Sequence, residues 1–313
     1  MSAPDFVAEI TAFATASVRM ATPLALAGLG ETYSERSGIL NIGLEAIMLC
    51  GAFAGFMVAN MTRNPALGIL AGAAAGLVIS IIHAFLSISC RADQTISGLA
   101  LNFFASGITS YPFLMHFGKT TNLAQCPVVP ILPVPYLSDI PFLGPVLLRN
   151  NAFVYAAVIA VALSAIFFRR TEWGVSLDAV GENPKAADSA GIDVSRTRYA
   201  AAAVNGIFGG LGGAFLTVGN LGFFMENITS GRGYIALVVV ILGRRMPFGV
   251  LLSALLLGAA DALQFRAQAA GVPIPSQVFI MFPYIAAVVV LLFSVGRSSE
   301  PAALGQGFER GRR

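Results

Sequence analysis

The chain has 313 residues, of which 56% are hydrophobic and only 11% are charged. Ordinary soluble domains carry about 25% charged residues, so this composition excludes a soluble domain and predicts an all-α polytopic membrane protein. The net charge of +3 is small, and we expect no nucleic-acid partner. The three cysteines are odd in number and lack metal-ligand spacing, which argues against a disulfide framework and against a metal site.

A membrane span requires about 20 mainly apolar residues, and five segments before residue 169 meet this criterion. The first contains Arg19 and Pro23, and a polar run, 30–38, follows it; we expect that run to be flexible. The connection 117–150 is rich in proline and is expected to be an external loop with a short helix. The candidate spans are Ile10–Leu29, Ile39–Asn60, Ala66–Ile88, Gln94–His116 and Asn151–Phe168.

The polar interval Arg169–Arg198 comes next and contains a complete short helix. Asn183 is a good N-cap, because its side-chain oxygen can accept from free amides, and Pro184 loses no hydrogen bond at the next position. Gly191 supplies the left-handed C-terminal stop. Between these signals the helix has a small, smooth face made of Ala186, Ala187 and Ala190. The pattern predicts a contact piece held between two membrane spans.

After this interval, Tyr199–Gly219 is a sixth span, whereas Gly233–Gly243 is too short to cross alone. Phe248–Phe265 and Gln277–Val295 close the membrane region, and the tail is polar and basic. We therefore expect one transmembrane domain with about 8–10 helices in two pseudo-repeated halves. Its parts are 10–168, the loop 169–198, 199–296 and the tail 297–313.

A weak internal echo relates the two halves. Ser37-Gly38 and Ser230–Gly233 each precede a glycine-interrupted apolar run, with Glu45 or Glu226 nearby. Discontinuous helices at matching positions are typical of transporters whose pathway lies between repeats. Chance similarity between small-residue-rich membrane helices is the alternative.

Basic residues orient the chain. The interval 169–198 holds five, whereas the similarly long connection 117–150 holds only Lys119 and Arg149, so the interval is expected in the cytoplasm. The side of the N-terminus stays open, because a re-entrant segment near 30–45 would change the parity. Further basic residues fall on the cytoplasmic side: Arg91, Arg244, Arg245, Arg297, Arg310, Arg312 and Arg313.

Three stretches, Ser34–Met48, Ala179–Ile192 and Gly231–Gly243, resemble the permease subunits of bacterial ABC importers of the branched-chain amino acid and simple-sugar superfamily. The middle stretch is specific for the superfamily, and Glu-Arg-Ser-Gly-Ile-Leu-Asn in the first is most similar to the nucleoside-type permeases. The resemblance covers nearly the whole chain. Ala46 departs from it, since many relatives have glycine there.

This resemblance implies a transport subunit of the inner (plasma) membrane that translocates nucleosides and is not an enzyme. Its partners would be an ABC ATPase subunit, a second and different permease chain, an extracytoplasmic solute-binding protein and membrane lipid. The chain has no phosphate-binding Gly-x-x-x-x-Gly-Lys-Ser/Thr loop, so it should bind no cofactor itself, and ATP and Mg would be used by the ATPase. The short cytoplasmic helix would be the coupling helix, docking on the ATPase through Gly181, Glu182, Asn183, Pro184, Ala187, Ala190 and Gly191.

Polar and aromatic residues in the spans are candidates for the substrate pathway. An ionised Glu45 costs at least about 2.5 kcal/mol in a membrane, so it serves either the pathway or a structural hydrogen bond. Asn41, one turn earlier, is expected to share its environment. Asn102 and Asn205 either line a cavity or join helices, and the phenylalanines either stack on a nucleobase or contact lipid. The candidates are Asn41, Glu45, Asn102, Phe103, Phe223, Glu226 and Asn227.

Two other functions stay open. Among ABC permeases, one for ribose-like sugars is the runner-up, and the type of solute-binding protein encoded beside it would discriminate the two. An ion-coupled secondary transporter would share the composition and the intramembrane carboxylate, but it would not need the capped cytoplasmic helix. An intramembrane enzyme is disfavoured, because no Ser/His, paired-Asp or His-Glu-x-x-His constellation occurs in the spans.

Overall fold

The computed structural model describes residues 3–118, 124–135, 138, 140–270, 276–294 and 300–309. Lys119 and the tail arginines Arg297, Arg310, Arg312 and Arg313, used above for orientation, lie outside these residues. The elements in chain order are α1 (Ala3–Arg36), α2 (Leu44–Thr62), α3 (Pro65–Ala84), η1 (Phe85–Ser89), α4 (Gln94–Phe117), β1 (Ile131–Pro133), η2 (Gly144–Leu148), β2 (Arg149–Asn151), α5 (Ala152–Arg170), α6 (Glu172–Glu182), α7 (Pro184–Ser189), α8 (Val194–Ala214), η3 (Phe215–Leu221), α9 (Arg232–Leu242), α10 (Pro247–Ala269) and α11 (Ser276–Ser294).

The expected fold class, an all-α polytopic membrane protein, is confirmed. Within the described ranges, six helices are long and apolar enough to span a membrane. They are α1, α2, α5 and α10, together with α3 and α8, each of which continues into a π-helical segment, η1 or η3. The eleven residues of α9 are too few to span alone, as the sequence indicates.

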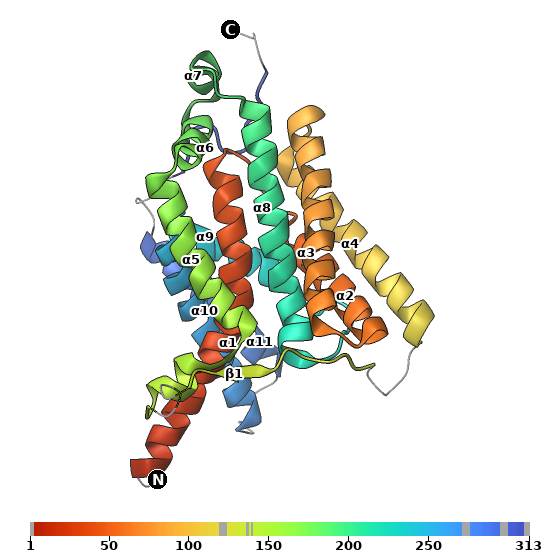
Figure 1. Cartoon of the computed structure of the whole chain (residues 1–313), viewed down its shortest axis with the longest axis vertical. Helices are drawn as coiled ribbons and strands as arrows, with labels where there is room; N and C mark the ends of the chain where they lie inside the picture. Colours follow the sequence, from red (N-terminus) through yellow and green to blue (C-terminus); the bar gives the residue numbers. More distant parts are fainter. Residues whose placement is uncertain are drawn as a thin grey trace.

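The two long polar connections lie at opposite ends of the bundle. Figure 1 shows α6 and α7 at one end, and the first turns of α1 together with β1 at the other. The proline-rich connection ends in an antiparallel pair in which Ile131 lies opposite Asn151. We call the two ends the α7 end and the β1 end.

Small residues bring the central helices close together. α2, α3 and α8 form the packed centre of the bundle, and most of the buried face of α8 is glycine or alanine. A Cβ placed on Gly76 of α3 would lie 2.3 Å from the carbonyl oxygen of Gly206 in α8. Membrane helices that lack a hydrophobic driving force gain association energy from such close packing.

The polar run 30–38, expected to be flexible, is instead mostly the last turns of α1, which continues unbroken to Arg36. The expectation was wrong because the acidic side chains of this run are paired inside the protein. Glu31 accepts from Asn205 at 2.6 Å, and Glu35 accepts from Arg245 at 2.5 Å. Both glutamates are buried, so the run is a packed helix end.

The second span begins later than expected, because residues 39–43 are not helical and α2 starts at Leu44. The free backbone amides of this segment are satisfied by side chains from other helices. The Leu40 amide donates to the Gln94 side chain at 2.8 Å, and the Asn41 amide donates to Glu31 at 3.0 Å. Gln94 lies 54 residues from Leu40 in the sequence, so hydropathy gives no sign of the break.

The interval 169–198 contains the expected short helix, α7, and an additional helix before it, α6. The Asn183 side chain accepts from the Ala186 amide at 3.0 Å, which confirms the predicted N-cap. Gly191 has φ of +89°, which confirms the left-handed stop. α6 has its own cap, Thr171, whose hydroxyl accepts from the Gly174 amide at 3.1 Å. We call α6 and α7 together the arm.

Candidate functional site

The carboxylate of Glu45 binds the N-terminus of α9. Its Oε1 accepts from the Thr229 hydroxyl at 2.6 Å and from the Gly231 amide at 2.8 Å. Its Oε2 accepts from the Gly233 amide at 2.7 Å. Free amides at a helix start carry partial positive charge, so they stabilise a carboxylate there. This arrangement accounts for a buried acid in a membrane span.

Gly233 is required by this contact. A Cβ at that position would lie 2.4 Å from the Glu45 amide nitrogen and 2.5 Å from its Cα. The two backbones therefore touch, and any side chain at position 233 would push α9 away from α2.

We infer from helix length that the contact lies near the middle of the membrane. A helix of eleven residues, such as α9, is about 16 Å long, roughly half of the ~30 Å hydrocarbon core. Its C-terminal neighbour Arg245 pairs with Glu35 toward the α7 end, so its N-terminus lies at mid-depth. A broken helix whose start binds polar groups at this depth is typical of transporter pathways.

Asn102 of α4 joins three elements at the same level. Its Oδ1 accepts from the Ala46 amide at 2.9 Å, and its Nδ2 donates to the Ile42 carbonyl at 3.1 Å and to the Tyr234 hydroxyl at 2.8 Å. The amide thereby caps the start of α2 and connects it to α9. We call Glu45, Asn102, Thr229, Gly231, Gly233 and Tyr234 the midplane cluster.

A polar stripe runs along α4 beside this cluster. Its members are seven or four residues apart, so they share one face of the helix with Asn102. All are exposed or half-buried in the isolated chain: Thr95, Asn102, Ser106 and Ser110. Lipid disfavours a row of hydroxyls and amides, so this face is poorly suited to direct contact with hydrocarbon.

Two further polar contacts surround the start of α9. Arg232 forms a mostly buried ion pair with Asp261 of α10 at 3.0 Å. The Tyr284 hydroxyl of α11 donates to the Ser230 carbonyl at 2.6 Å. The charges nearest the midplane cluster are therefore already compensated within the chain.

Asn41 and Glu45 do not share an environment, contrary to expectation, because α2 begins only after Asn41. Asn41 lies with Glu31 and Asn205, whereas Glu45 binds α9. Asn205 therefore joins α8 to α1. Sequence reasoning did not select Glu31, although a glutamate in an apolar surrounding was its available signal.

The remaining pathway candidates are dispersed. Phe103 projects from α4 with 80% of its surface exposed, outside the midplane cluster. Phe223 is half-buried and pairs through its backbone with Gln125, toward the β1 end. Glu226 and Asn227 are exposed in the connection before α9. None of these four joins the contacts around Glu45.

The coupling candidates divide into exposed and buried residues. Glu182, Asn183, Ala190 and Gly191 are exposed, and Pro184 is half-buried. Gly181 is buried at the end of α6, where a Cβ would lie 2.1 Å from the Arg36 carbonyl. Ala187 is only 3% exposed and packs against Val180 and Val194. Ala187 therefore covers the arm's own core, because one side of so short a helix must pack inward.

The arm is bound to the end of α1 by charge. Asp178 of α6 forms a bidentate ion pair with Arg36, whose guanidinium also lies 4.0 Å above the Phe168 ring. Displacing the arm would therefore pull on α1, which leads through residues 39–43 to Glu45.

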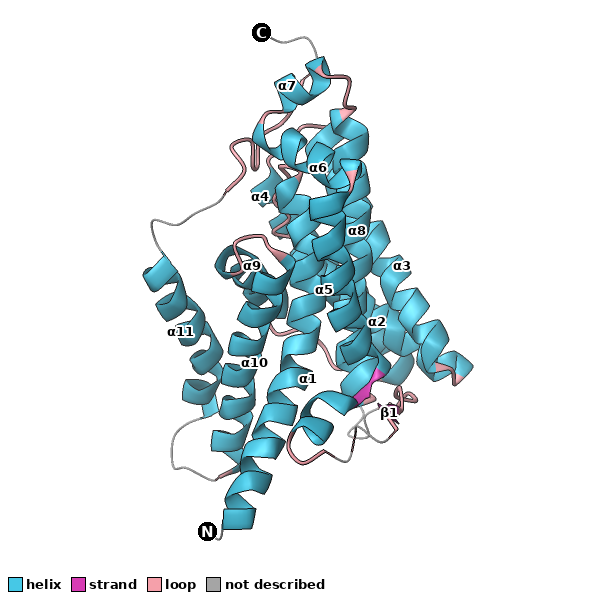
Figure 2. Ribbon diagram, turned by 60° about the vertical axis from the view of Figure 1, so that its left-hand side comes forward, coloured by secondary structure: helices cyan, strands magenta, loops and turns pink. Residues whose placement is uncertain are grey.

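The tail completes this end of the molecule. Ala303 donates to the Gly181 carbonyl at 2.9 Å, and Gly305 donates to the Gly38 carbonyl at 3.0 Å. Arg198, which is 1% exposed, donates to the carbonyls of Ser37 and Gln306. The arm, the end of α1, the start of α8 and the tail are thus joined by hydrogen bonds and an ion pair. Figure 2 shows α6 and α7, the two helices of the arm, at one end of the molecule.

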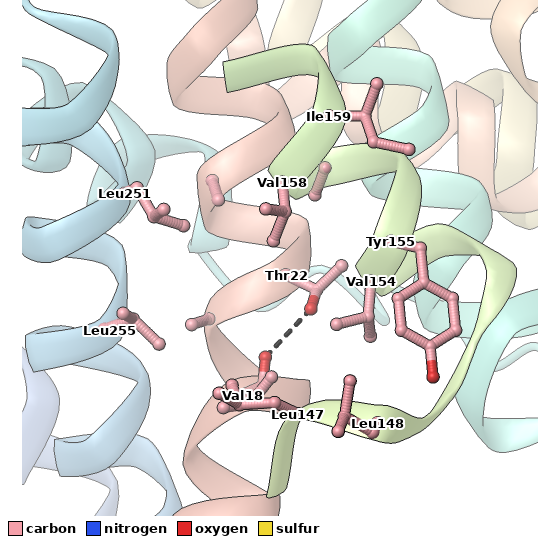
Figure 3. A pocket seen from close by; sticks show the side chains of 13 residues that line it. Val18, Thr22, Leu147, Leu148, Val154, Tyr155, Val158, Ile159, Leu251 and Leu255 are labelled. Atoms are coloured by element: carbon pink, nitrogen blue, oxygen red, sulfur yellow. Dashed lines mark hydrogen bonds between the residues drawn. The ribbon is translucent and has the colours of Figure 1, made fainter. Parts of the chain in front are cut away.

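An apolar groove of about 470 Å³ lies between α1, α5 and α10 (Figure 3). Val18, Val158 and Leu251 line the groove. The Thr22 hydroxyl, which also lines it, donates to the Val18 carbonyl at 2.8 Å and is therefore not available to a ligand. Such a lining suits hydrocarbon and offers little to a hydroxylated solute. We therefore place the candidate pathway at the midplane cluster and not in this groove.

Comparison with known proteins gives a consistent set of relatives. Residues 13–293 match the family described as branched-chain amino acid transport system, permease component. The guanosine ABC transporter permease protein NupQ of Bacillus subtilis is 36% identical over 325 residues, covering 99% of this chain and 100% of NupQ. The nucleoside ABC transporter permease protein NupC of Lactococcus lactis is 34% identical, covering 92% and 93%.

A third relative has a different substrate in its name. The putative glucose ABC transporter permease protein TsgC13 of Haloferax volcanii is 36% identical over 322 residues, covering 94% of this chain and 96% of TsgC13. No solved structure matches the chain.

Proposed function

Because this chain belongs to the permease family of branched-chain amino acid-type ABC transport systems, and is thus a multi-pass inner-membrane transport subunit rather than an enzyme, we propose that it imports nucleosides. ATP hydrolysis belongs to a separate subunit. The observation that carries the choice of substrate is full-length similarity to a guanosine and a nucleoside permease.

The chemistry of the midplane cluster supports a neutral, polar solute. The Glu45 carboxylate is occupied by three donors, and Arg232 is paired with Asp261. A zwitterionic amino acid would need uncompensated charges of both signs to replace its hydration. Nucleosides need hydrogen-bonding groups and flat surfaces instead, and Tyr234 and the hydroxyls of the α4 stripe provide these.

The partners follow from this assignment. An ATPase would dock on the exposed side of the arm, and ATP and Mg would act there and not on this chain. Since about half of the α4 surface is uncovered, we propose that a second permease, of a different sequence, closes the pathway against it. A solute-binding protein would deliver the nucleoside at the β1 end.

The mechanism then uses the fastened α7 end. Closure of the ATPase would move the arm, and the Arg36–Asp178 pair would transmit that motion to α1. The segment 39–43 carries it on to α2 and Glu45, which holds the start of α9. Movement of α9 against α4 would then change access to the midplane.

A sugar permease is the second candidate, favoured by the similarity to TsgC13. The test is uptake of radiolabelled uridine, adenosine, ribose and leucine by cells expressing this chain with its neighbouring genes. We expect uptake of the two nucleosides. Uptake of ribose alone would replace the nucleoside assignment by the sugar one, and uptake of leucine alone would contradict both.

A further inference from the structure

Tyr234 was not among the residues selected from the sequence, and it holds an unusual position in the midplane cluster. It lies in the first turn of α9, one residue after the glycine that touches Glu45, and 39% of its surface is exposed. The hydroxyl meets the side-chain amide of Asn102 at 2.8 Å.

The direction of that hydrogen bond is fixed by the surroundings of Asn102. Its oxygen accepts from the Ala46 amide at 2.9 Å, and its nitrogen faces the Ile42 carbonyl at 3.1 Å. Reversing the side-chain amide would set donor against donor and acceptor against acceptor. Asn102 therefore donates to Tyr234, and the tyrosine oxygen is the acceptor.

The hydroxyl proton of Tyr234 remains available. Among the hydrogen bonds of the described residues, none has Tyr234 as donor, whereas Tyr284 nearby spends its proton on Ser230. An unsatisfied donor is costly at mid-membrane depth, so this side of α9 does not face lipid. It borders the polar α4 stripe, where Ser106 and Thr95 are also exposed.

We propose that Tyr234 is a specificity-determining contact of the pathway, whose hydroxyl donates to an acceptor atom of the passing nucleoside. This inference rests on the proposed nucleoside function. The hydrogen bonds of Asn102 to Ala46 and Ile42 fix the orientation of its side-chain amide. Its third hydrogen bond, to the Tyr234 hydroxyl, then holds the phenol in place. The exposed phenol ring offers a flat face on which a base can stack.

The test compares Tyr234→Phe with the wild type in proteoliposomes holding the complete importer, with its ATPase and binding protein. The matched control is Tyr111→Phe, which removes a hydroxyl from a tyrosine on α4 that is 68% exposed. Uridine and adenosine uptake and ATP hydrolysis are measured at saturating substrate. The uptake KM is not used, since the binding protein influences it.

In Tyr234→Phe we expect about fivefold to tenfold less nucleoside transported per ATP hydrolysed, the effect of one lost hydrogen bond. ATP hydrolysis and thermal stability should stay at the wild-type level, and Tyr111→Phe should match the wild type. If transport of both nucleosides slows, the contact is to the ribose that they share. If transport of only one slows, the contact is to the base of that nucleoside.

Two results would overturn the inference. One is unchanged transport per ATP in Tyr234→Phe. The other is a parallel loss of stability and ATP hydrolysis, which would make the hydroxyl a structural partner of Asn102. Failure of the wild-type importer to transport either nucleoside contradicts the proposed function instead, so the two failures are distinguishable.

Discussion

Replacing Glu45 with alanine should release the start of α9 from α2. The carboxylate accepts three hydrogen bonds of 2.6–2.8 Å, and a hydrogen bond to a charged group contributes about 1.5–3 kcal/mol. Insertion of the charge costs about 2.5–3.5 kcal/mol, so the three bonds outweigh it. We expect the variant to lose about 2–5 kcal/mol of stability.

The assay is thermal unfolding of the purified complex, in which the exposed Cys90 and the second buried cysteine, Cys126, are replaced by serine, followed by reaction of a thiol-reactive dye with Cys50. This thiol is buried in α2 and becomes accessible only when the helix separates from its neighbours. The variant should unfold at least about 5 °C below the wild type. The arm lies at the α7 end, so the ATPase should still co-purify while nucleoside uptake is lost.

The matched control is Glu226→Ala, which removes an exposed carboxylate from the connection before α9. It should leave both the unfolding temperature and uptake unchanged. A Glu45→Ala variant with wild-type unfolding temperature and wild-type uptake would refute the reasoning, because the three hydrogen bonds would then contribute nothing.

Three further predictions concern the α7 end. Ala186→Glu, on the exposed side of α7, should abolish co-purification of the ATPase without lowering thermal stability. Ala187→Glu should abolish co-purification and also destabilise the arm, since the Ala187 side chain is buried. Wild-type co-purification in both variants would contradict the docking assignment. Arg36→Asp should reduce nucleoside uptake several-fold, because it breaks the ion pair with Asp178. The double variant Arg36→Asp/Asp178→Arg should restore part of that uptake. If it restores none, the ion pair does not transmit motion. Cys90, exposed at the α7 end, should react with a membrane-permeable maleimide but not with an impermeant one added to intact cells. Reaction with the impermeant maleimide would place the α7 end outside the cell and invert the orientation.

The helical architecture was readable from the sequence because hydropathy and capping are local properties. The bounds of α4 and α5 as helices agree with the expected segments to within two residues, although α4 is not among the six helices apolar enough to count as spans. The N-cap of α7 by Asn183 and its stop at Gly191 are equally local, and both are present.

The errors arose where distant residues decide the local structure. The helix through Glu31 and Glu35 is possible because Asn205 and Arg245 meet those carboxylates from α8 and from the loop after α9. The break before α2 is held by Gln94 of α4. A single sequence gives the polarity of these side chains but not their partners.

The candidate site was recovered in part. Glu45 and Asn102 stand out as polar residues within spans, and both belong to the midplane cluster. Tyr234 lies in the stretch Gly231–Gly243, which resembles the permease family. Only the fixed side-chain amide of Asn102, which donates to the Tyr234 hydroxyl, shows that the hydroxyl proton has no acceptor among the described residues. Ala187 has the small size expected of a docking residue, and its burial depends on Val180 and Val194.

The central claim is that ATP, and not an ion gradient, drives solute movement through this chain. The direct measurement is uridine uptake into proteoliposomes holding the complete importer, with ATP enclosed or absent, and with the phosphate-loop lysine of the ATPase intact or replaced by alanine. The account predicts uptake only with ATP and the intact lysine, and no response to an imposed proton or sodium gradient. Uptake that survives the lysine variant and follows an ion gradient would contradict it and establish a secondary transporter.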